Sequence, residues 1–170
     1  MSDEPRDPAL REELLALFAE DQAARHAVMA DQTAENSARV EAIDRKTTAR
    51  MKELVATVGW PGRSLVGRNA ANAAWCLVQH ADHDVAFQRE CLPLIERAVA
   101  DGQAEPDHAA YLYDRIAVAE RRPQRYGTQY GPDGHPQPIE DGANVDARRA
   151  AVGLEPLAEY DARMQALFKR

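Results

Sequence analysis

Three short polar segments interrupt the otherwise apolar helical sequence in the middle of this chain. They are residues 79–84 (QHADHD), 113–115 (YDR) and 123–129 (PQRYGTQ). Burying ionisable and amide groups is unfavourable unless they are paired, and ionisable groups with strong local interactions gather at functional sites. The three segments therefore mark a candidate site.

His80 is the first candidate for chemistry, because imidazole titrates near neutrality and can transfer protons. It ends the most apolar stretch of the chain, where a helix terminus would also favour its positive charge. We predict that His80 acts as a general acid–base. Structural capping of the helix end is the alternative.

Asp114 and Arg115 occupy the middle of another apolar helical stretch. If that helix faces His80, Asp114 can orient the imidazole or act as a base, and we predict it as the second catalytic residue. The guanidinium of Arg115 can hold a carboxylate or phosphate through two hydrogen bonds. An ion pair between helices is the alternative for both residues.

Residues 123–129 combine amide, phenol and hydroxyl groups around a glycine. Loops of this kind commonly carry binding residues over a rigid scaffold, although a hydrogen-bonded plug would use the same groups. Arg25 lies four residues after Asp21, a spacing at which the two can form an ion pair. The residues predicted to bind substrate are Arg25, Arg115, Gln124, Tyr126 and Gln129.

A metal site is the alternative chemistry for the first segment. His80, His83 and Asp84 share one helix face if helical geometry continues through them. A catalytic metal needs at least three protein ligands in a suitable geometry. The further ligands in this case would be Asp44, His108 or Asp114. We favour no cofactor, and a divalent metal is the alternative.

These residues predict an enzyme that hydrolyses, eliminates or cyclises a small molecule or a modified peptide. Its helical pocket would be covered by residues 123–129, and its ligand would be small and polar or anionic, or a peptide. The two rivals are a metal-dependent enzyme and a non-catalytic binding or interaction module whose polar core specifies packing.

The apolar residues that must position these groups recur with a period near 3.6 over most of the chain. This pattern predicts an all-α fold: one compact domain, residues 1–170, of about six or seven helices. We expect disorder over residues 1–6 and a small β-hairpin or loop insertion near residues 123–142. Asp7 before Pro8 predicts the first helix start, and a central helix is expected from Ser64 or Gly67 to His80.

Charge and hydropathy narrow the class of partner. The chain has 21 basic and 28 acidic residues and a net charge of −7, with no basic stripe, so we expect no nucleic-acid binding. No apolar run approaches the roughly 18 residues that a spanning helix needs, and no signal peptide is recognisable. We therefore expect a cytoplasmic protein without a membrane partner.

Several of these motifs, taken together, resemble those of a known family. The combination of GWP at residues 59–61, QHAD at 79–82, DR at 114–115 and PQRYGTQ at 123–129 resembles a family of uncharacterised bacterial proteins, a domain of unknown function. The resemblance covers about residues 10–160. It implies a shared site and brings no established activity, substrate or catalytic assignment.

Overall fold

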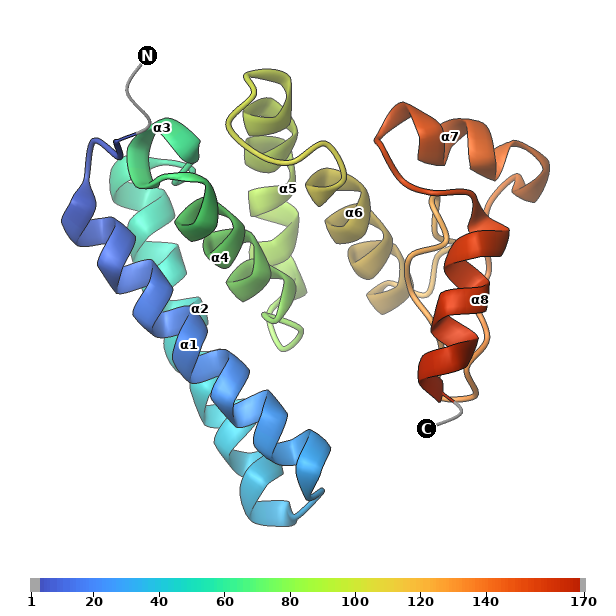
Figure 1. Ribbon diagram of the computed structural model, residues 1–170, viewed down its shortest axis with the longest axis horizontal. Helices are drawn as coiled ribbons and strands as arrows, with labels where there is room; N and C mark the ends of the chain where they lie inside the picture. The colour runs from blue at the N-terminus through green and yellow to red at the C-terminus, as the bar shows by residue number, and fades with distance from the viewer. Residues whose placement is uncertain (1–3, 169–170) are drawn as a thin grey trace. The chain divides into compact units, whose positions relative to one another are not determined.

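The computed structural model describes residues 4–168, and all regular structure within them is helical (Figure 1). The predicted all-α fold is confirmed. The helices are α1 (Pro8–Ala30), α2 (Ala34–Val58), α3 (Arg63–Val66), α4 (Arg68–Gln79), α5 (Val85–Ala100), α6 (His108–Ala119), the 3-10 helix η1 (Gly142–Asn144), α7 (Val145–Ala151) and α8 (Leu157–Phe168). Within residues 4–168, no helix is both long and apolar enough to cross a membrane.

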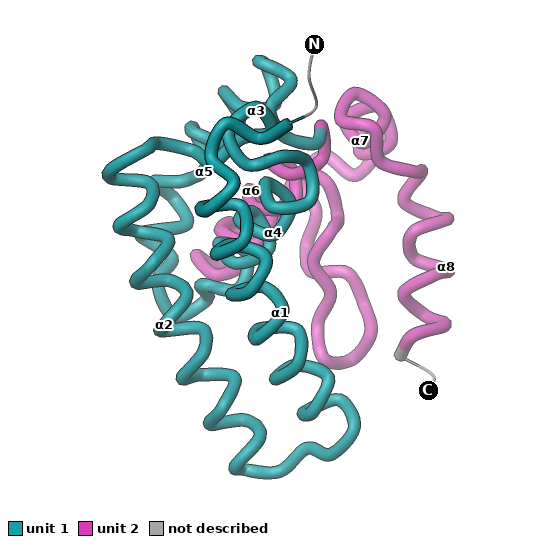
Figure 2. The backbone as a smooth tube through the Cα atoms, turned by 60° about the vertical axis from the view of Figure 1, so that its left-hand side comes forward, with its two compact units in different colours: residues 1–105 teal, residues 106–170 magenta. Residues whose placement is uncertain are grey.

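The chain divides into two compact units, residues 1–105 and 106–170 (Figure 2). The prediction of one domain over residues 1–170 stays a prediction, and each unit is described by itself below. Of the segment predicted to be disordered, residues 1–3 lie outside the described residues. Arg6 has a defined place, since its side chain donates hydrogen bonds to the carbonyl and hydroxyl oxygens of Ser64.

In unit 1, α1 and α2 run side by side as a helical hairpin. The start of α1 is as predicted: a carboxylate oxygen of Asp7 accepts a hydrogen bond from the backbone N–H of Leu10 at 2.9 Å, and Pro8 follows. Thr33 caps α2 in the same way, through Asn36. Gly59 ends α2 with a φ of 74°, a conformation that favours glycine.

The predicted central helix is present as α4, which starts directly after Gly67, the later of the two expected starts. The chain turns at Gly67 with a φ of 79°, which separates α4 from the short helix α3. Helix α4 packs against α1 and α2. Its buried apolar side chains are mostly small, which allows the helices to approach closely. They are Ala70, Ala71, Ala73, Ala74, Leu77 and Val78. His80 is the C-terminal cap of α4.

In unit 2, α6 leads into the irregular segment predicted near residues 123–142, followed by η1, α7 and α8. The hairpin within it is reduced to two isolated bridges, Gln124 with Ile139 and Tyr130 with Pro136. The backbone N–H of Gln137 donates to the Gln129 carbonyl at 3.0 Å. The amide nitrogen of the Gln124 side chain donates to the backbone oxygens of Gln129 and Gln137. Side-chain hydrogen bonds thus supplement the few backbone bonds across this loop.

Candidate functional site

His80 forms a hydrogen-bonded pair with Asp21 in unit 1. Its Nδ1 lies 2.9 Å from Oδ1 of Asp21, a residue of α1 whose side chain is 1% exposed. An ionised carboxylate only accepts hydrogen bonds, so Nδ1 carries the proton, and Nε2 of the neutral ring carries a lone pair. The His80 side chain is 21% exposed. Among residues 4–168, Nε2 has no hydrogen-bond partner, so this atom is available for chemistry.

The guanidinium of Arg25 joins this pair to α2. Its Nε lies 3.0 Å from Asp21 Oδ1 and 3.0 Å from His80 Nδ1, and its Nη2 donates to Asp44 Oδ1 at 2.5 Å. Because Nδ1 is protonated, the Nε–H group donates to Asp21. The predicted ion pair between Asp21 and Arg25 is confirmed. We call these four residues, Asp21, Arg25, Asp44 and His80, the His80 cluster.

The two carboxylates of the cluster differ in acidity. Burial pushes the pKa of Asp21 up, but hydrogen bonding to His80 and Gln22 and the charge of Arg25 outweigh it, so the pKa lies below its usual value. Burial also raises the pKa of Asp44, and Arg25 compensates only in part, so that pKa lies above its usual value. Asp21 is therefore the carboxylate that keeps its negative charge beside His80.

Three members of the His80 cluster form the one group of three potential metal ligands found within residues 4–168. Asp21, Asp44 and His80 each offer one ligand atom, and these atoms lie within 4.8 Å of one another. Arg25 contacts all three residues. The guanidinium therefore supplies the positive charge that a metal ion would bring to these carboxylates.

The other proposed metal ligands have different surroundings. Asp84 caps α5 by accepting a hydrogen bond from the backbone N–H of Phe87 at 3.1 Å, and it pairs with Lys52 at 2.5 Å. His83 is exposed in the turn before α5. His108 is buried at the start of α6, in unit 2. Of the candidates for a further ligand, the structure groups only Asp44 with His80 among the described residues.

Asp114 is buried in unit 2 and holds the loop that follows α6. Its carboxylate accepts hydrogen bonds from the backbone N–H groups of Arg125 (2.7 Å), Tyr126 (3.1 Å) and Thr128 (3.0 Å), and from the Thr128 hydroxyl (3.0 Å). Burial raises the pKa of Asp114, and these donors oppose the rise. The approach of Asp114 to His80 stays a prediction, because the two residues belong to different units.

The predicted substrate-binding residues of unit 2 divide by their environment. Gln124 is fully buried, and its side-chain amide forms hydrogen bonds with the backbone of Gln129 in the same loop. This arrangement is the one expected if residues 123–129 form a hydrogen-bonded plug. Tyr126 and Gln129 are partly exposed, as is Arg115 on α6. Tyr126 packs edge to face against Tyr113, with ring centroids 6.4 Å apart. Three of these residues thus retain surface that a ligand can reach.

Sequence reasoning did not pair Asp21 with His80, and it named Asp44 only as one of three possible further metal ligands. The available signal was that each interrupts an apolar helical stripe, as Arg25 does. Which interruptions meet one another depends on how α1, α2 and α4 pack. That information is not carried by the spacing of residues along any one helix.

Comparison with known proteins gives one match. The model of a protein family described as a family of unknown function matches residues 8–168, nearly the whole chain. No curated protein and no solved structure matches. The resemblance identified from the motifs is confirmed at the level of the family.

Proposed function

We propose that this chain, which belongs to the family of unknown function DUF6624, is a general acid–base enzyme in which Nε2 of His80 transfers the proton. The observation that carries the proposal is the pairing of His80 Nδ1 with the buried carboxylate of Asp21 at 2.9 Å. This pairing fixes the tautomer and leaves the lone pair of Nε2 on the partly exposed ring.

Asp21 supports the proton transfer through its hydrogen bond to Nδ1, the ring nitrogen that does not contact the substrate. When Nε2 accepts a proton from the substrate, the imidazolium that forms is stabilised by the ionised carboxylate at Nδ1. Arg25 holds that carboxylate through its Nε–H group. His80 then returns the proton to a leaving group, as hydrolysis, elimination or cyclisation requires. Asp21 thereby takes the orienting role that the sequence analysis assigned to Asp114.

The substrate in this proposal is a small polar or anionic molecule, or a peptide. Arg115, Tyr126 and Gln129 remain proposed binding residues because they are partly exposed. Arg25 contributes by charge and position, since two of its nitrogens already donate to carboxylates. Asp114 contributes by fixing the backbone of residues 125–128.

Replacement of His80 tests the proposal. A panel of esters, amides, phosphodiesters and peptides is screened for turnover by the intact protein, and the His80→Gln variant is then compared with it. We expect kcat to fall by roughly 10²–10⁴-fold, while the melting temperature is largely retained. His135→Gln is the control, because His135 is exposed in unit 2. Unfolding of His80→Gln, or unchanged turnover, would contradict the acid–base role.

A metal-dependent enzyme is the second candidate, favoured by the grouping of Asp21, Asp44 and His80. Metal binding there requires Arg25 to release both carboxylates. Dialysis against EDTA separates the two candidates: acid–base catalysis by His80 predicts unchanged turnover, whereas loss of turnover that Zn²⁺ or Mn²⁺ restores would establish the metal-dependent alternative. Metal analysis of the purified protein before dialysis gives the number of metal ions bound per chain.

A further inference from the structure

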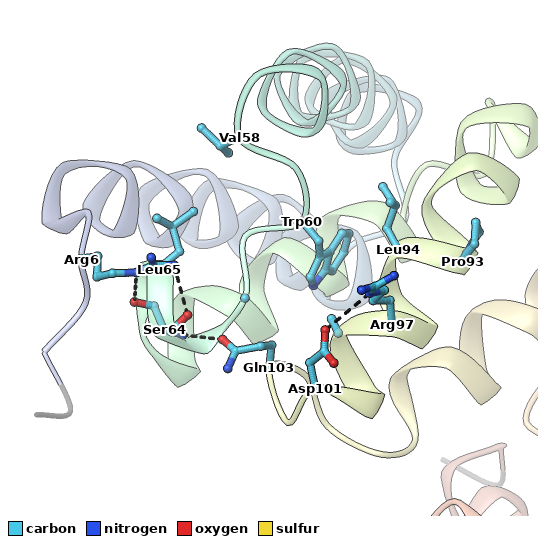
Figure 3. A pocket seen from close by; sticks show the side chains of 12 residues that line it. Arg6, Val58, Trp60, Ser64, Leu65, Pro93, Leu94, Arg97, Asp101 and Gln103 are labelled. Carbon is cyan, nitrogen blue, oxygen red and sulfur yellow. Dashed lines mark hydrogen bonds and ion pairs between the residues drawn. The ribbon is translucent and has the colours of Figure 1, made fainter. Parts of the chain in front are cut away.

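Unit 1 contains a cavity of about 450 Å³ that is separate from the His80 cluster (Figure 3). It lies between the turn that follows α2 and one side of α5, with Trp60 of the GWP motif in its wall. Its volume falls within the range of roughly 300–1,000 Å³ that is typical of sites for small organic ligands. The acid–base proposal assigns no role to this cavity or to Trp60.

The wall of the cavity is mainly apolar. Trp60, in the turn after α2, and Leu94 of α5 both contribute to it, together with Val58, which is 47% exposed. The indole nitrogen of Trp60 is itself enclosed, so the part of the ring that a ligand can reach is carbon. A large aromatic surface of this kind favours an apolar and preferably aromatic ligand, through stacking or edge-to-face contact.

Hydrogen bonds hold the walls in place. The backbone N–H of Arg63 donates to the Gln103 carbonyl at 3.0 Å, and that of Ser64 donates to the Gln103 side chain at 2.8 Å. The N-terminal segment is joined to the same turn by the bond from Asp7 N–H to the Leu65 carbonyl at 2.9 Å. Gly62 is required here, because a Cβ at this position would lie 2.8 Å from Gln103 Cβ. The cavity is therefore preformed, which lowers the entropic cost of binding.

The charged groups at the cavity favour an anion. Two guanidinium groups, Arg6 and Arg97, line it with one carboxylate, Asp101. Arg6 donates to Ser64, whereas Arg97 forms only a loose pair with Asp101 at 3.7 Å. Both side chains of that pair are well exposed, Arg97 to 84% and Asp101 to 60%. Arg97 is thus free to form the two-pronged contact that guanidinium groups make with carboxylates.

We propose that this cavity binds a small aromatic carboxylate. The aromatic ring lies against Trp60 and Leu94, and the carboxylate pairs with Arg97 at the opening. The proposal is independent of the reaction at His80, because the two sites share no residue.

The chain offers a direct fluorescence test, because it has two tryptophans, Trp60 and Trp75. In the full-length Trp75→Phe variant, all tryptophan emission comes from Trp60. This protein is titrated with phenylacetate, 2-phenylethanol and 2-phenylethylammonium, which share an aromatic body and differ in charge. We expect a saturable change in Trp60 emission with phenylacetate, at a dissociation constant on the order of 1 mM, and weaker binding of the alcohol and the ammonium ion.

Charge variants then test the role of Arg97. In the same background, Arg97→Gln should weaken phenylacetate binding about two- to five-fold, as expected for an exposed ion pair, and leave 2-phenylethanol unaffected. Asp101→Asn should tighten phenylacetate binding. Arg39→Gln makes the same charge change at an exposed α2 position outside the cavity and should have no effect. Absence of a saturable response, equal binding of all three ligands, or insensitivity to Arg97→Gln would overturn the proposal.

Discussion

At the scale of single residues, the His80 cluster shows how one cation supports two carboxylates with different properties. Arg25 donates to both Asp21 and Asp44, yet only Asp21 also bonds to His80. The hydrogen bonds from His80 and Gln22 to Asp21 account for the opposite directions of the two pKa shifts, since burial raises the pKa of both carboxylates. Asp21 is therefore suited to stay ionised in the proposed acid–base reaction.

The order in which the two aspartates take up protons is a test of this description. As the pH falls, Asp44, with its raised pKa, should be protonated before Asp21, whose pKa is lowered. Carboxyl ¹³C NMR titration of the intact protein measures both. The Asp44→Asn variant assigns the earlier transition, and the reverse order would contradict the proposed pairing of Asp21 with His80.

The same shifts have opposite consequences for stability. The contribution of Asp21 is fully present above the pKa of an unfolded aspartate, about 3.9, and is lost as the pH falls through the lower pKa of the folded protein. The contribution of Asp44 to stability has the opposite sign: its raised pKa means that ionised Asp44 destabilises the folded state, because the folded state binds the proton more readily than the unfolded state. Acidification towards pH 4 therefore relieves the cost of Asp44 before the contribution of Asp21 is lost.

At the scale of helices and loops, the elements with local signals were predictable. The start of α1 at Asp7 and the end of α2 at Gly59 depend on side chains and backbone conformations at those positions. The reduction of the hairpin to two isolated bridges was not predictable in this way. The bonds from the buried Gln124 side chain arise only when distant parts of the loop come together.

Local signals also predicted part of the candidate site. The apolar context of His80 predicted it as a site residue, which stays a prediction. The spacing of Asp21 and Arg25 predicted their ion pair, which the structure confirms. The hydrogen bond from His80 to Asp21 joins α4 to α1, and the bond from Arg25 to Asp44 joins α1 to α2. Contacts between helices require the packing geometry, which the sequence pattern leaves open.

The loop after α6 gives a prediction at this scale. Asp114→Asn places an amide NH₂ group among N–H donors that now bond to a carboxylate, so several hydrogen bonds are lost or weakened. We expect a loss of about 2–3 kcal/mol in the free energy of unfolding, with faster hydrogen exchange at the amides of residues 125, 126 and 128. Chemical denaturation and exchange mass spectrometry measure the two effects.

Asp133→Asn is the matched control for this change. Asp133 is exposed in the same loop and accepts one hydrogen bond from the backbone N–H of His135. Its replacement should change the free energy of unfolding by no more than about 0.5 kcal/mol. Equal effects of the two substitutions would show that Asp114 does not anchor the loop.

At the scale of the whole molecule, the predicted site residues are divided between the two units. His80 and Arg25 belong to residues 1–105, whereas Asp114, Arg115 and residues 124–129 belong to residues 106–170. A domain of roughly 60 residues buries only about 60% of the surface that its unfolded chain exposes, which makes it marginally stable alone. We therefore expect the second unit to unfold together with the first, as the prediction of one domain requires.

The positions of the tryptophans allow this cooperativity to be measured. Trp60 and Trp75 both lie in unit 1, so tryptophan emission reports the unfolding of that unit, whereas far-ultraviolet circular dichroism reports helices throughout the chain. Asp114→Asn destabilises the chain from within unit 2. In a single cooperative domain, both signals should therefore shift to lower temperature by the same amount, roughly 5–10 °C for the loss expected above. An unchanged tryptophan transition beside a lowered dichroism transition would show that the two units unfold independently, and would refute the prediction of one domain.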